Sequence, residues 1–266
     1  MDVNVLQRQF GRIGARARVR WLDGRRDTGA VALDIVRDGA GELFDIRMPK
    51  STPPEVEVLQ SAPQLRHLLL MARDAGGEKH KFLCGHDERH WFVAAVPERL
   101  AVSTVRNAME ALKPPMLVQR QDQLQVRQKN RNRRRNEAFV RQGEWFFVPV
   151  PWFTADERFV LKSEPLRRGG GKPHRVEFLC RSGGETVYVC SQHPQGLTEA
   201  RYNTLVSRRP EARGWRWVTM RRNPSVYVKG RVRHADHATI VLDGWHQVLM
   251  NTETQAAAMR HVAFLD

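Results

Sequence analysis

The segment Val126-Arg-Gln-Lys-Asn-Arg-Asn-Arg-Arg-Arg-Asn136 lies near the middle of the chain, and Glu137-Ala-Phe-Val-Arg141 follows it. Residues 118–142 contain neither glycine nor proline, and Gly143 stands where the C-terminal cap of a helix is common. We therefore predict a basic helical segment over residues 119–142. Residues 127–136 carry no apolar stripe, so such a helix would be solvated or would lie against a charged partner.

The same segment is the first candidate for phosphate contact. Within residues 126–141 the only acid is Glu137, and so dense a group of cations repels itself unless an anion lies nearby. The basic side chains are Arg127, Lys129, Arg131, Arg133, Arg134, Arg135 and Arg141.

This segment divides the chain into two parts. A length of 266 residues suits one large domain or two modest ones. We predict an N-terminal α+β domain over residues 1–118, a basic helical connector over 119–142 and a C-terminal, basic, β-rich α+β domain over 143–266. No apolar run approaches the roughly 18–20 residues that span a membrane.

The first part reads as strands with a few helices. Alternating and turn-bounded apolar runs predict an antiparallel meander of three strands, and later runs predict a second hairpin between two helices. A turn is expected at 24–29. The predicted elements are strands at 15–22, 30–36 and 42–48, a helix at 58–72, hairpin strands at 80–84 and 90–96, and a helix at 104–112.

The second part is richer in strands. Its prolines confine residues 145–153 to an edge strand or an extended segment. The class is α+β with antiparallel, hairpin-rich sheets, because helices and strands do not alternate as in βαβ folds. The other predicted elements are strands at 176–180, 186–190, 215–222, 225–234, 238–242 and 245–250, a helix at 198–207 and a terminal helix from 252.

The two parts share a short pattern. Phe82-Leu-Cys84 and Phe178-Leu-Cys180 both follow a glycine-containing stretch, and each precedes a polar turn, an apolar strand and a predicted helix. A duplicated strand–turn–strand–helix unit would make the two parts related halves. The alternative is a chance similarity between two hairpins.

The charge is large and unevenly placed. The net charge is +15 and the isoelectric point about 10.7. Acids and bases nearly balance up to Val118, and the excess lies between Arg120 and Arg233. A localised positive surplus attracts a polyanion. Nucleic acid is therefore the favoured partner, with another anionic surface or a simple solubility effect as alternatives.

Two further basic surfaces lie in the second part. Lys229, Arg231 and Arg233 alternate with Val228 and Val232, which places three cations in a row roughly 7 Å apart on one strand face. The second surface interleaves tryptophans that could stack bases or, alternatively, point into the core. Its residues are Arg213, Trp215, Arg216, Trp217, Arg221 and Arg222. In the first part, by contrast, cross-strand acids such as Asp34 and Asp45 are expected to satisfy Arg16, Arg18 and Arg20.

Two histidine groups are candidates for metal binding or catalysis. Cys84, His86 and His90 are possible zinc ligands, while His86, His90, His234, Asp236 and His237 are candidate groups of a nuclease. There is no Cys-x-x-Cys pair and no recognised spacing, so ordinary turn residues explain them as well. We therefore expect no resident cofactor, with zinc or another divalent metal as the alternative.

Three functions remain open from the sequence. The favoured one is a non-catalytic nucleic-acid-binding protein, with RNA or single-stranded nucleic acid slightly preferred over duplex DNA. The alternatives are a nuclease or related processing enzyme, and a structural subunit that docks on a ribonucleoprotein or an acidic protein. No membrane partner is expected. An odd count of three cysteines, Cys84, Cys180 and Cys190, and the lack of a secretory signal predict reduced thiols and a cytoplasmic location.

Overall fold

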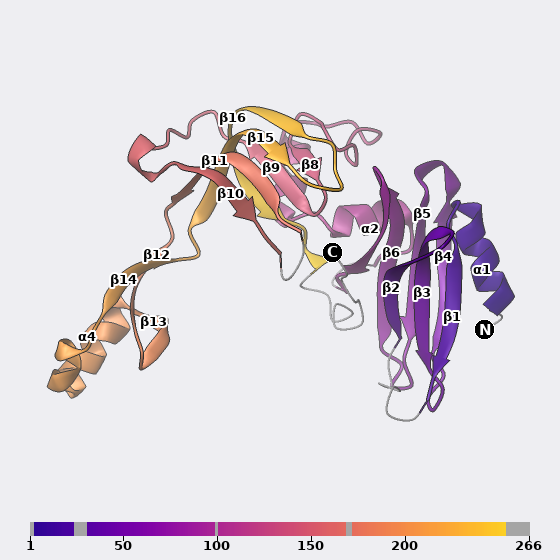
Figure 1. Cartoon of the computed structure of the whole chain (residues 1–266), viewed down its shortest axis with the longest axis horizontal. Helices are drawn as coiled ribbons and strands as arrows, with labels where there is room; N and C mark the ends of the chain where they lie inside the picture. The colour runs from indigo at the N-terminus through magenta and orange to yellow at the C-terminus, as the bar shows by residue number, and fades with distance from the viewer. Residues whose placement is uncertain (1–2, 24–30, 99–100, 169–171, 254–266) are drawn as a thin grey trace.

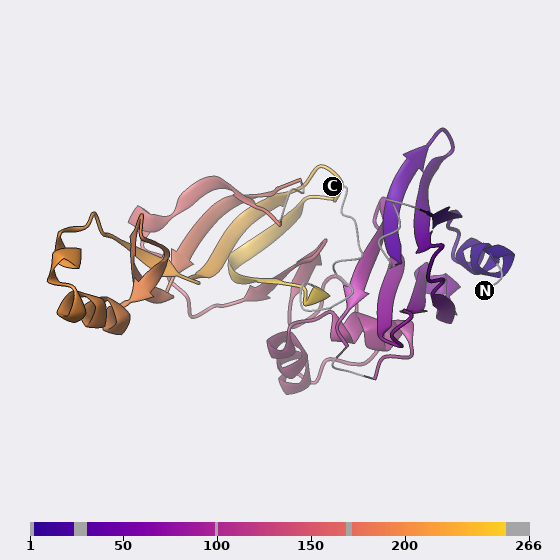
Figure 2. The same cartoon turned by 90° about the horizontal axis from the view of Figure 1, so that it is seen from below.

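A computed structural model describes residues 3–23, 31–98, 101–168 and 172–253 of the chain. The molecule is elongated, with the first part at one end, a larger curled sheet next to it and a small lobe at the far end (Figures 1 and 2). The described residues form four α-helices and four sheets, and nearly all strand pairs are antiparallel. The predicted α+β class with antiparallel sheets is confirmed. None of these helices has the length and apolar character needed to cross a membrane.

The first sheet contains β1 (Ala17–Leu22), β2 (Ala32–Asp38) and β3 (Gly41–Pro49), and helix α1 (Val3–Arg12) precedes it. The hairpin of β2 and β3 is confirmed, but the antiparallel meander is wrong because β1 pairs with β3 in parallel. This pairing sets Arg18 opposite Asp45, whose carboxylate takes ion pairs from both Arg18 and Arg20. In this parallel register, Asp45 of β3 thus pairs with two arginines of β1. The turn predicted at 24–29 lies outside the described residues.

The second sheet has the order β4-β5-β6-β7, and its strands are β4 (Glu55–Ala62), β5 (His67–Arg73), β6 (Lys79–Asp87) and β7 (His90–Val96). The helix predicted over 58–72 is wrong. Leu68 and Leu70 pack with α1 and β3 on one face of β5, and Leu69 packs with α2 (Val105–Ala111) on the other. A strand buried on both faces has a continuous apolar run, which resembles the side of a helix in sequence.

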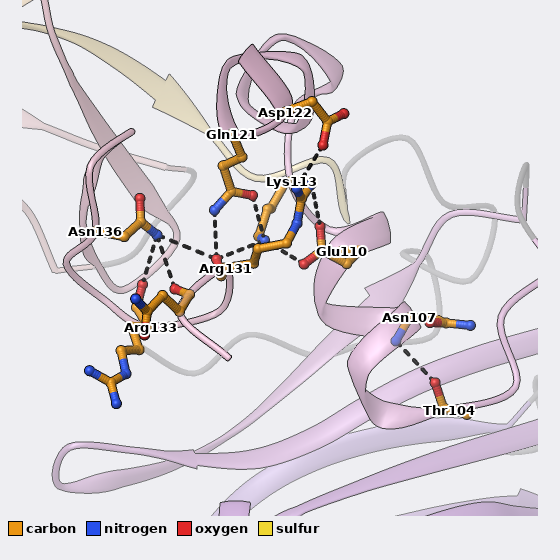
Figure 3. A network of polar contacts seen from close by, with 10 residues as sticks. Thr104, Asn107, Glu110, Lys113, Gln121, Asp122, Arg131, Arg133 and Asn136 are labelled. Atoms are coloured by element: carbon orange, nitrogen blue, oxygen red, sulfur yellow. Dashed lines mark hydrogen bonds and ion pairs between the residues drawn. The ribbon is translucent and has the colours of Figure 1, made fainter. Parts of the chain in front are cut away.

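The predicted hairpin of β6 and β7 and the helix at 104–112 are confirmed. Thr104 caps α2 by accepting a hydrogen bond from the Asn107 amide at 3.1 Å (Figure 3). α2 thus closes the second face of the sheet and leaves its C-terminus next to the central segment.

The central segment is only partly helical. Helix α3 spans Pro115–Gln123, and residues 124–139 form an irregular loop, here called the central loop, that leads to β8 (Val140–Gln142). The continuous helix predicted over 119–142 is therefore wrong beyond Gln123. Val126, Ala138 and Phe139 are buried with Phe146 and Val148, so the loop packs on the second part instead of standing in solvent.

Asparagine explains why this loop is not helical. The Asn136 side chain accepts hydrogen bonds from the Ala138 and Phe139 amides at 2.9 and 3.2 Å. Its amide nitrogen lies 3.4–3.5 Å from the carbonyls of Asn130, Arg131 and Arg133 (Figure 3). Such side-chain bonds to the backbone compete with helical hydrogen bonds and stabilise turns.

The largest sheet has the order β10-β11-β15-β16-β9-β8. Side chains from both of its edge strands, Leu166 and Val140, join one buried cluster, so the sheet curls around its own core. The predicted edge segment at 145–153 forms β9, which pairs on both sides, while Pro149 and Pro151 mark its end. Besides β8, the strands of this sheet are β9 (Trp145–Pro149), β10 (Leu161–Leu166), β11 (His174–Ser182), β15 (Ser225–Arg233) and β16 (Ile240–Met250). β16 is continuous through Gly244, where two strands and a turn were predicted.

The far lobe, here called the outer lobe, spans residues 185–222 (Figure 1). It contains β12 (Glu185–Cys190), β13 (His193–Thr198), α4 (Glu199–Arg208) and β14 (Val218–Arg222), together with a short 3-10 turn at Pro210–Gly214. Two further 3-10 turns, at Pro63–Leu65 and Glu157–Phe159, lie outside the lobe. The pair β11–β15 continues directly into the pair β12–β14, through Gly183-Gly184 and Asn223-Pro224. A β-carbon on Gly184 would lie 2.6 Å from the Arg222 carbonyl oxygen, which explains glycine there.

This joint removes the basis for the predicted duplication. β6 and β7 pair with each other, whereas β11 and β12 belong to different sheets. The polar stretch Arg181-Ser-Gly-Gly184 resembles a hairpin turn in sequence but connects two sheets, with Gly183 and Gly184 at φ of 74° and 80°. The terminal helix predicted from residue 252 lies beyond the described residues apart from its first two positions.

Candidate functional site

Part of the predicted basic surface is used inside the protein. Arg131 is only 7% exposed, and its guanidinium lies 2.6 Å from an Asp122 carboxylate oxygen. Its carbonyl accepts hydrogen bonds from Lys113 Nζ at 2.9 Å and Gln121 Nε2 at 2.8 Å (Figure 3). Arg131 is therefore a structural residue that fixes the central loop to the ends of α2 and α3.

Lys113 is the centre of this network. Its ammonium group is buried and donates to Glu110 Oε1 at 2.7 Å and Gln121 Oε1 at 2.9 Å. Burial lowers the pKa of Lys113 to about 8, although the bond to Glu110 acts in the opposite direction. The hydrogen bonds thus do not fully compensate for removing this charge from water.

Two other arginines of the central segment hold the two parts together. Arg134 forms ion pairs with Asp87 and Glu88 at the tip of the β6–β7 hairpin, and Arg141 lies 3.6 Å from Asp87. Arg127, Lys129, Arg133 and Arg135 are exposed, and the Arg133 guanidinium points away from the network (Figure 3). Four of the seven predicted cations remain open to a partner.

A second basic surface covers the outer side of the largest sheet. We call it the basic sheet face, and its exposed members are Lys162, Arg175, Lys229, Arg231 and Arg233. Val228 and Val232 alternate with the β15 cations and are fully buried, as predicted. Arg175 and Arg233 stand directly opposite each other in the β11–β15 pair. Half-buried Phe178 stands between Lys162 and Lys229.

Like charges opposite each other on neighbouring strands destabilise a sheet. In the described chain no member of the basic sheet face forms an ion pair with an acid. The half-buried carboxylate of Glu177 accepts a hydrogen bond from the backbone amide of Arg231 at 2.9 Å. The face therefore keeps a cross-strand repulsion that an external anion would relieve.

The outer lobe combines arginines with a stack of aromatic rings. Trp215, Trp217 and His193 lie nearly parallel, with ring centroids 5.8–6.0 Å apart, and Tyr202 meets Trp217 edge-on. The Trp217 indole donates to the Ala212 carbonyl at 2.8 Å. Both tryptophans are half-buried. The two tryptophans therefore pack against each other, as core residues do, and keep part of each ring exposed, as a base-stacking platform requires.

The lobe is strongly basic. It contains seven arginines, no lysine and three glutamates. Arg222 pairs with Glu185 and also bonds to the Gln195 and Gly196 carbonyls, so it is structural. The remaining arginines are exposed and form no ion pair with a described acid; they are Arg201, Arg208, Arg209, Arg213, Arg216 and Arg221.

Three histidines meet where β11 begins and β15 ends. Each of His174, His234 and His237 offers a ring nitrogen, and these nitrogens lie within 4.8 Å of one another. The His174 ring is 2% exposed, and neither of its nitrogens has a hydrogen-bond partner among the described residues. Burial, together with His234 and His237, lowers the pKa of His174 to about 3. We call this group the three-histidine cluster.

Charged side chains from both parts surround this cluster. Asp236 lies 2.8 Å from Lys172 Nζ and 3.7 Å from His90 Nε2, and Glu88 lies 3.7 Å from His237 Nδ1. Burial would raise the pKa of Asp236, but the hydrogen bond from Lys172 together with the charges of Lys172, His90 and His234 outweighs it, and the pKa lies below its usual range. His90 is thus brought next to Asp236, which lies between His234 and His237 in a distant part of the sequence.

The predicted ligand group Cys84, His86 and His90 is not brought together within the described chain. Cys84 is fully buried in the first core, where burial raises the pKa of its thiol. His86 packs edge-on against Trp91. His90 turns to Glu42 at 2.5 Å and towards Asp236. All three cysteines are free, as expected.

Sequence reasoning missed His174, Glu88 and Arg175 as site residues. A signal for His174 existed, since it lies two residues before the strand predicted at 176–180 and His234 ends the strand predicted at 225–234. An antiparallel pairing of those two strands brings the start of one beside the end of the other. That pairing could not be recognised, because 176–180 was assigned to a hairpin with 186–190.

No protein-family model, curated protein or solved structure matches the chain. Its function must therefore be inferred from the chemistry of its own residues.

Proposed function

We propose that the protein binds nucleic acid, with RNA or single-stranded nucleic acid favoured, and holds the phosphate backbone without cleaving it. The observation that carries this proposal is the pair Arg175 and Arg233. These arginines face each other across two strands, in the same surface as Lys229 and Arg231, and no described acid pairs with them. Phosphate oxygens are the ligands that such a row of cations accommodates.

The partition of arginines between paired and open positions supports the proposal. In the first part Arg16, Arg18, Arg20 and Arg47 each pair with an aspartate. In the second part the open cations gather on the basic sheet face and the outer lobe. Arg8, Arg12 and Arg37 are also exposed in the first part. The first two lie on helix α1 and Arg37 stands opposite Glu42, so these three do not form a row of cations on one strand face.

The aromatic stack of the outer lobe favours single strands. Trp215 and Trp217 are half-exposed and flanked by the exposed Arg213 and Arg216. Base stacking on such rings contributes about 1–3 kcal/mol per base and tolerates any sequence. Bases of a duplex are already stacked on each other and gain less.

The test is binding of fluorescently labelled single-stranded RNA, single-stranded DNA and duplex DNA, followed by anisotropy at low salt. The triple variant Lys229→Gln, Arg231→Gln, Arg233→Gln should bind at least tenfold more weakly than the wild type. A matched control, Arg8→Gln, Arg12→Gln, Arg37→Gln, removes the same charge from exposed positions of the first part and should bind nearly as the wild type does.

The result also separates the alternatives. If the wild type binds no nucleic acid at low salt but co-purifies with an acidic protein, the proposal is replaced by a structural subunit of a multiprotein complex or a ribonucleoprotein. Equal losses in both triple variants would mean that only total charge matters and that the basic sheet face is no site.

A processing enzyme is the second candidate, and one observation favours it. His90, Asp236 and His237 from two distant regions lie beside His174 and His234. Incubating labelled RNA and DNA with the wild type and His237→Ala, with and without a chelator, tests this function. Cleavage that is lost in the variant would favour the enzyme. The free, buried cysteines fit the cytoplasmic location that we propose for either function.

A further inference from the structure

We propose that the three-histidine cluster is a binding site for one divalent transition-metal ion, and that Zn²⁺ fits it best. The inference does not depend on nucleic-acid binding. It concerns His174 at the start of β11 and His234 and His237 in the loop after β15.

The first argument is convergence. The ring nitrogens of the three histidines lie within 4.8 Å of one another, although residue 174 is 60 positions from 234 in sequence. A β-carbon on Gly143 would lie 3.1 Å from His237 Nε2 and 3.3 Å from His174 Nε2. Two Nε2 atoms thus border the same point in space, and the missing side chain of Gly143 leaves that point open.

The second argument is that His174 lacks hydrogen bonds. Both of its ring nitrogens are buried and without a partner among the described residues, and so is His237 Nδ1. Buried polar groups are bonded in the great majority of cases, and one that is not implies an unseen partner or a functional role. The ring neighbours of His174 are His234, His237 and Trp145, and the indole nitrogen of Trp145 cannot accept a hydrogen bond. A cation at the point that the Nε2 atoms border would give one ring nitrogen of each imidazole a partner, His174 Nε2 included.

The third argument is the set of outer contacts. Histidines that bind metals usually give their other nitrogen to a carboxylate or carbonyl, which orients the ring. Glu88 Oε2 stands 3.7 Å from His237 Nδ1 and accepts a hydrogen bond from the Ala238 amide at 2.7 Å, while Glu88 Oε1 pairs with Arg134. His234 contacts the Asp236 amide at 3.1 Å and the Lys172 carbonyl at 3.3 Å, one of which must be exchanged for the metal bond.

The chemistry of the donors selects the metal. Three imidazoles without thiolate or carboxylate suit Zn²⁺, Cu²⁺ or Ni²⁺ and do not suit Mg²⁺ or Ca²⁺. Zn–N bonds of 2.0–2.1 Å in a tetrahedron place the nitrogens about 3.4 Å apart. The three ring nitrogens lie within 4.8 Å of one another, so no pair has to approach by more than about 1.4 Å. With three protein ligands the fourth position is open to water, as in catalytic zinc sites.

A second group of potential metal ligands, which includes two acids, provides the internal control. Asp74, Glu78 and His80 also offer three ligand atoms within 4.8 Å of one another, at the turn between β5 and β6. The Asp74 carboxylate already accepts a hydrogen bond from the Glu78 amide at 2.9 Å, which explains its position without a metal. His80→Gln therefore removes a histidine of the other candidate group and leaves the three-histidine cluster intact.

The experiment uses the full chain, stripped with a chelator and titrated with Zn²⁺ by calorimetry and with Co²⁺ by visible absorption. The wild type and His80→Gln should bind one ion per chain, and Co²⁺ should give the intense d–d bands of a four-coordinate site. His174→Phe and His237→Gln should lose both signals. Phenylalanine keeps an aromatic ring against Trp145 and buries no polar nitrogen, so this variant is expected to fold. Glu88→Gln should weaken Zn²⁺ affinity roughly 10–100-fold.

Two results would overturn the proposal. One is a wild type that takes up no more Zn²⁺ than His174→Phe, with both chains folded by circular dichroism. The other is stoichiometric binding that is lost in His80→Gln and kept in His174→Phe and His237→Gln, which would place the ion at the β5–β6 turn. Because His237→Gln changes a partly exposed side chain, it decides the question even if His174→Phe does not fold.

Discussion

Replacing Lys113 with methionine should alter how stability depends on pH. Burial lowers the pKa of Lys113 to about 8 in the folded chain, whereas a lysine in an unfolded chain titrates near 10.4. Between these values the unfolded state binds more protons, so the stability of the wild type rises as pH increases through 8 and levels off above 10.4. The rise between pH 7.5 and 9.5 is about 2 kcal/mol, at 1.36 kcal/mol per pKa unit.

The assay is urea unfolding of the wild type and Lys113→Met at pH 7.5 and 9.5. Subtracting the two proteins cancels the contributions of other groups that titrate in this range. The stability of the wild type relative to Lys113→Met should increase by about 2 kcal/mol at the higher pH. Lys129→Met, at an exposed position of the central loop, controls for the loss of a lysine as such. A relative stability that is constant or falls with pH would show that Lys113 is not the buried charge that holds the central loop.

Three further variants test the loop, the joint and the aromatic stack. Asn136→Ala removes the acceptor of the Ala138 and Phe139 amides, which lie in buried residues, and should lower the free energy of unfolding by about 2–4 kcal/mol in urea titrations. Gly184→Ala places a β-carbon against the Arg222 carbonyl at a φ of +80° and should destabilise the outer lobe by about 1–3 kcal/mol, seen as earlier loss of amide protection in 185–222 by hydrogen exchange. Trp215→Ala should weaken binding of single-stranded RNA by about 1–3 kcal/mol in anisotropy titrations, with a smaller effect on duplex DNA; equal losses would speak against base stacking.

Local patterns were sufficient for much of the fold. The β2–β3 and β6–β7 hairpins were predicted from apolar runs and turn residues, and the helices α2 and α4 lie where helices were predicted. The structure adds that Thr104 and Thr198 cap these helices. β5 did not, because a strand between two cores shows the same leucine run as a helix. The pairing of β1 with β3 also escaped, since parallel register depends on long-range contacts.

The central arginine stretch shows what composition cannot reveal. Its charge and lack of glycine suggested a solvated helix, but Asn136 and the buried Val126, Ala138 and Phe139 make it a packed loop. Arg131 forms an ion pair with Asp122, and Arg134 forms ion pairs with Asp87 and Glu88. Sequence gives the number of arginines, whereas only the folded chain distinguishes those with internal acids from those without.

The basic sheet face and the three-histidine cluster could likewise be predicted only in part from the sequence. The β15 cations were predicted from alternation alone, and they lie exposed over buried valines. Arg175 joins them only through the register of β11 with β15. His174 joins His234 and His237 through the same register, which is why the three-histidine cluster could not be predicted from spacing.

The central claim is that Lys229, Arg231 and Arg233 contact phosphates, and the most direct test is the salt dependence of binding. For a single strand, the slope of log K against log salt falls by about 0.7 for each phosphate contact. The wild type should show a steep negative slope on single-stranded RNA, and Lys229→Gln, Arg231→Gln, Arg233→Gln should reduce its magnitude by about 2. An unchanged slope in this triple variant, or a wild type that binds without salt dependence, would contradict the claim.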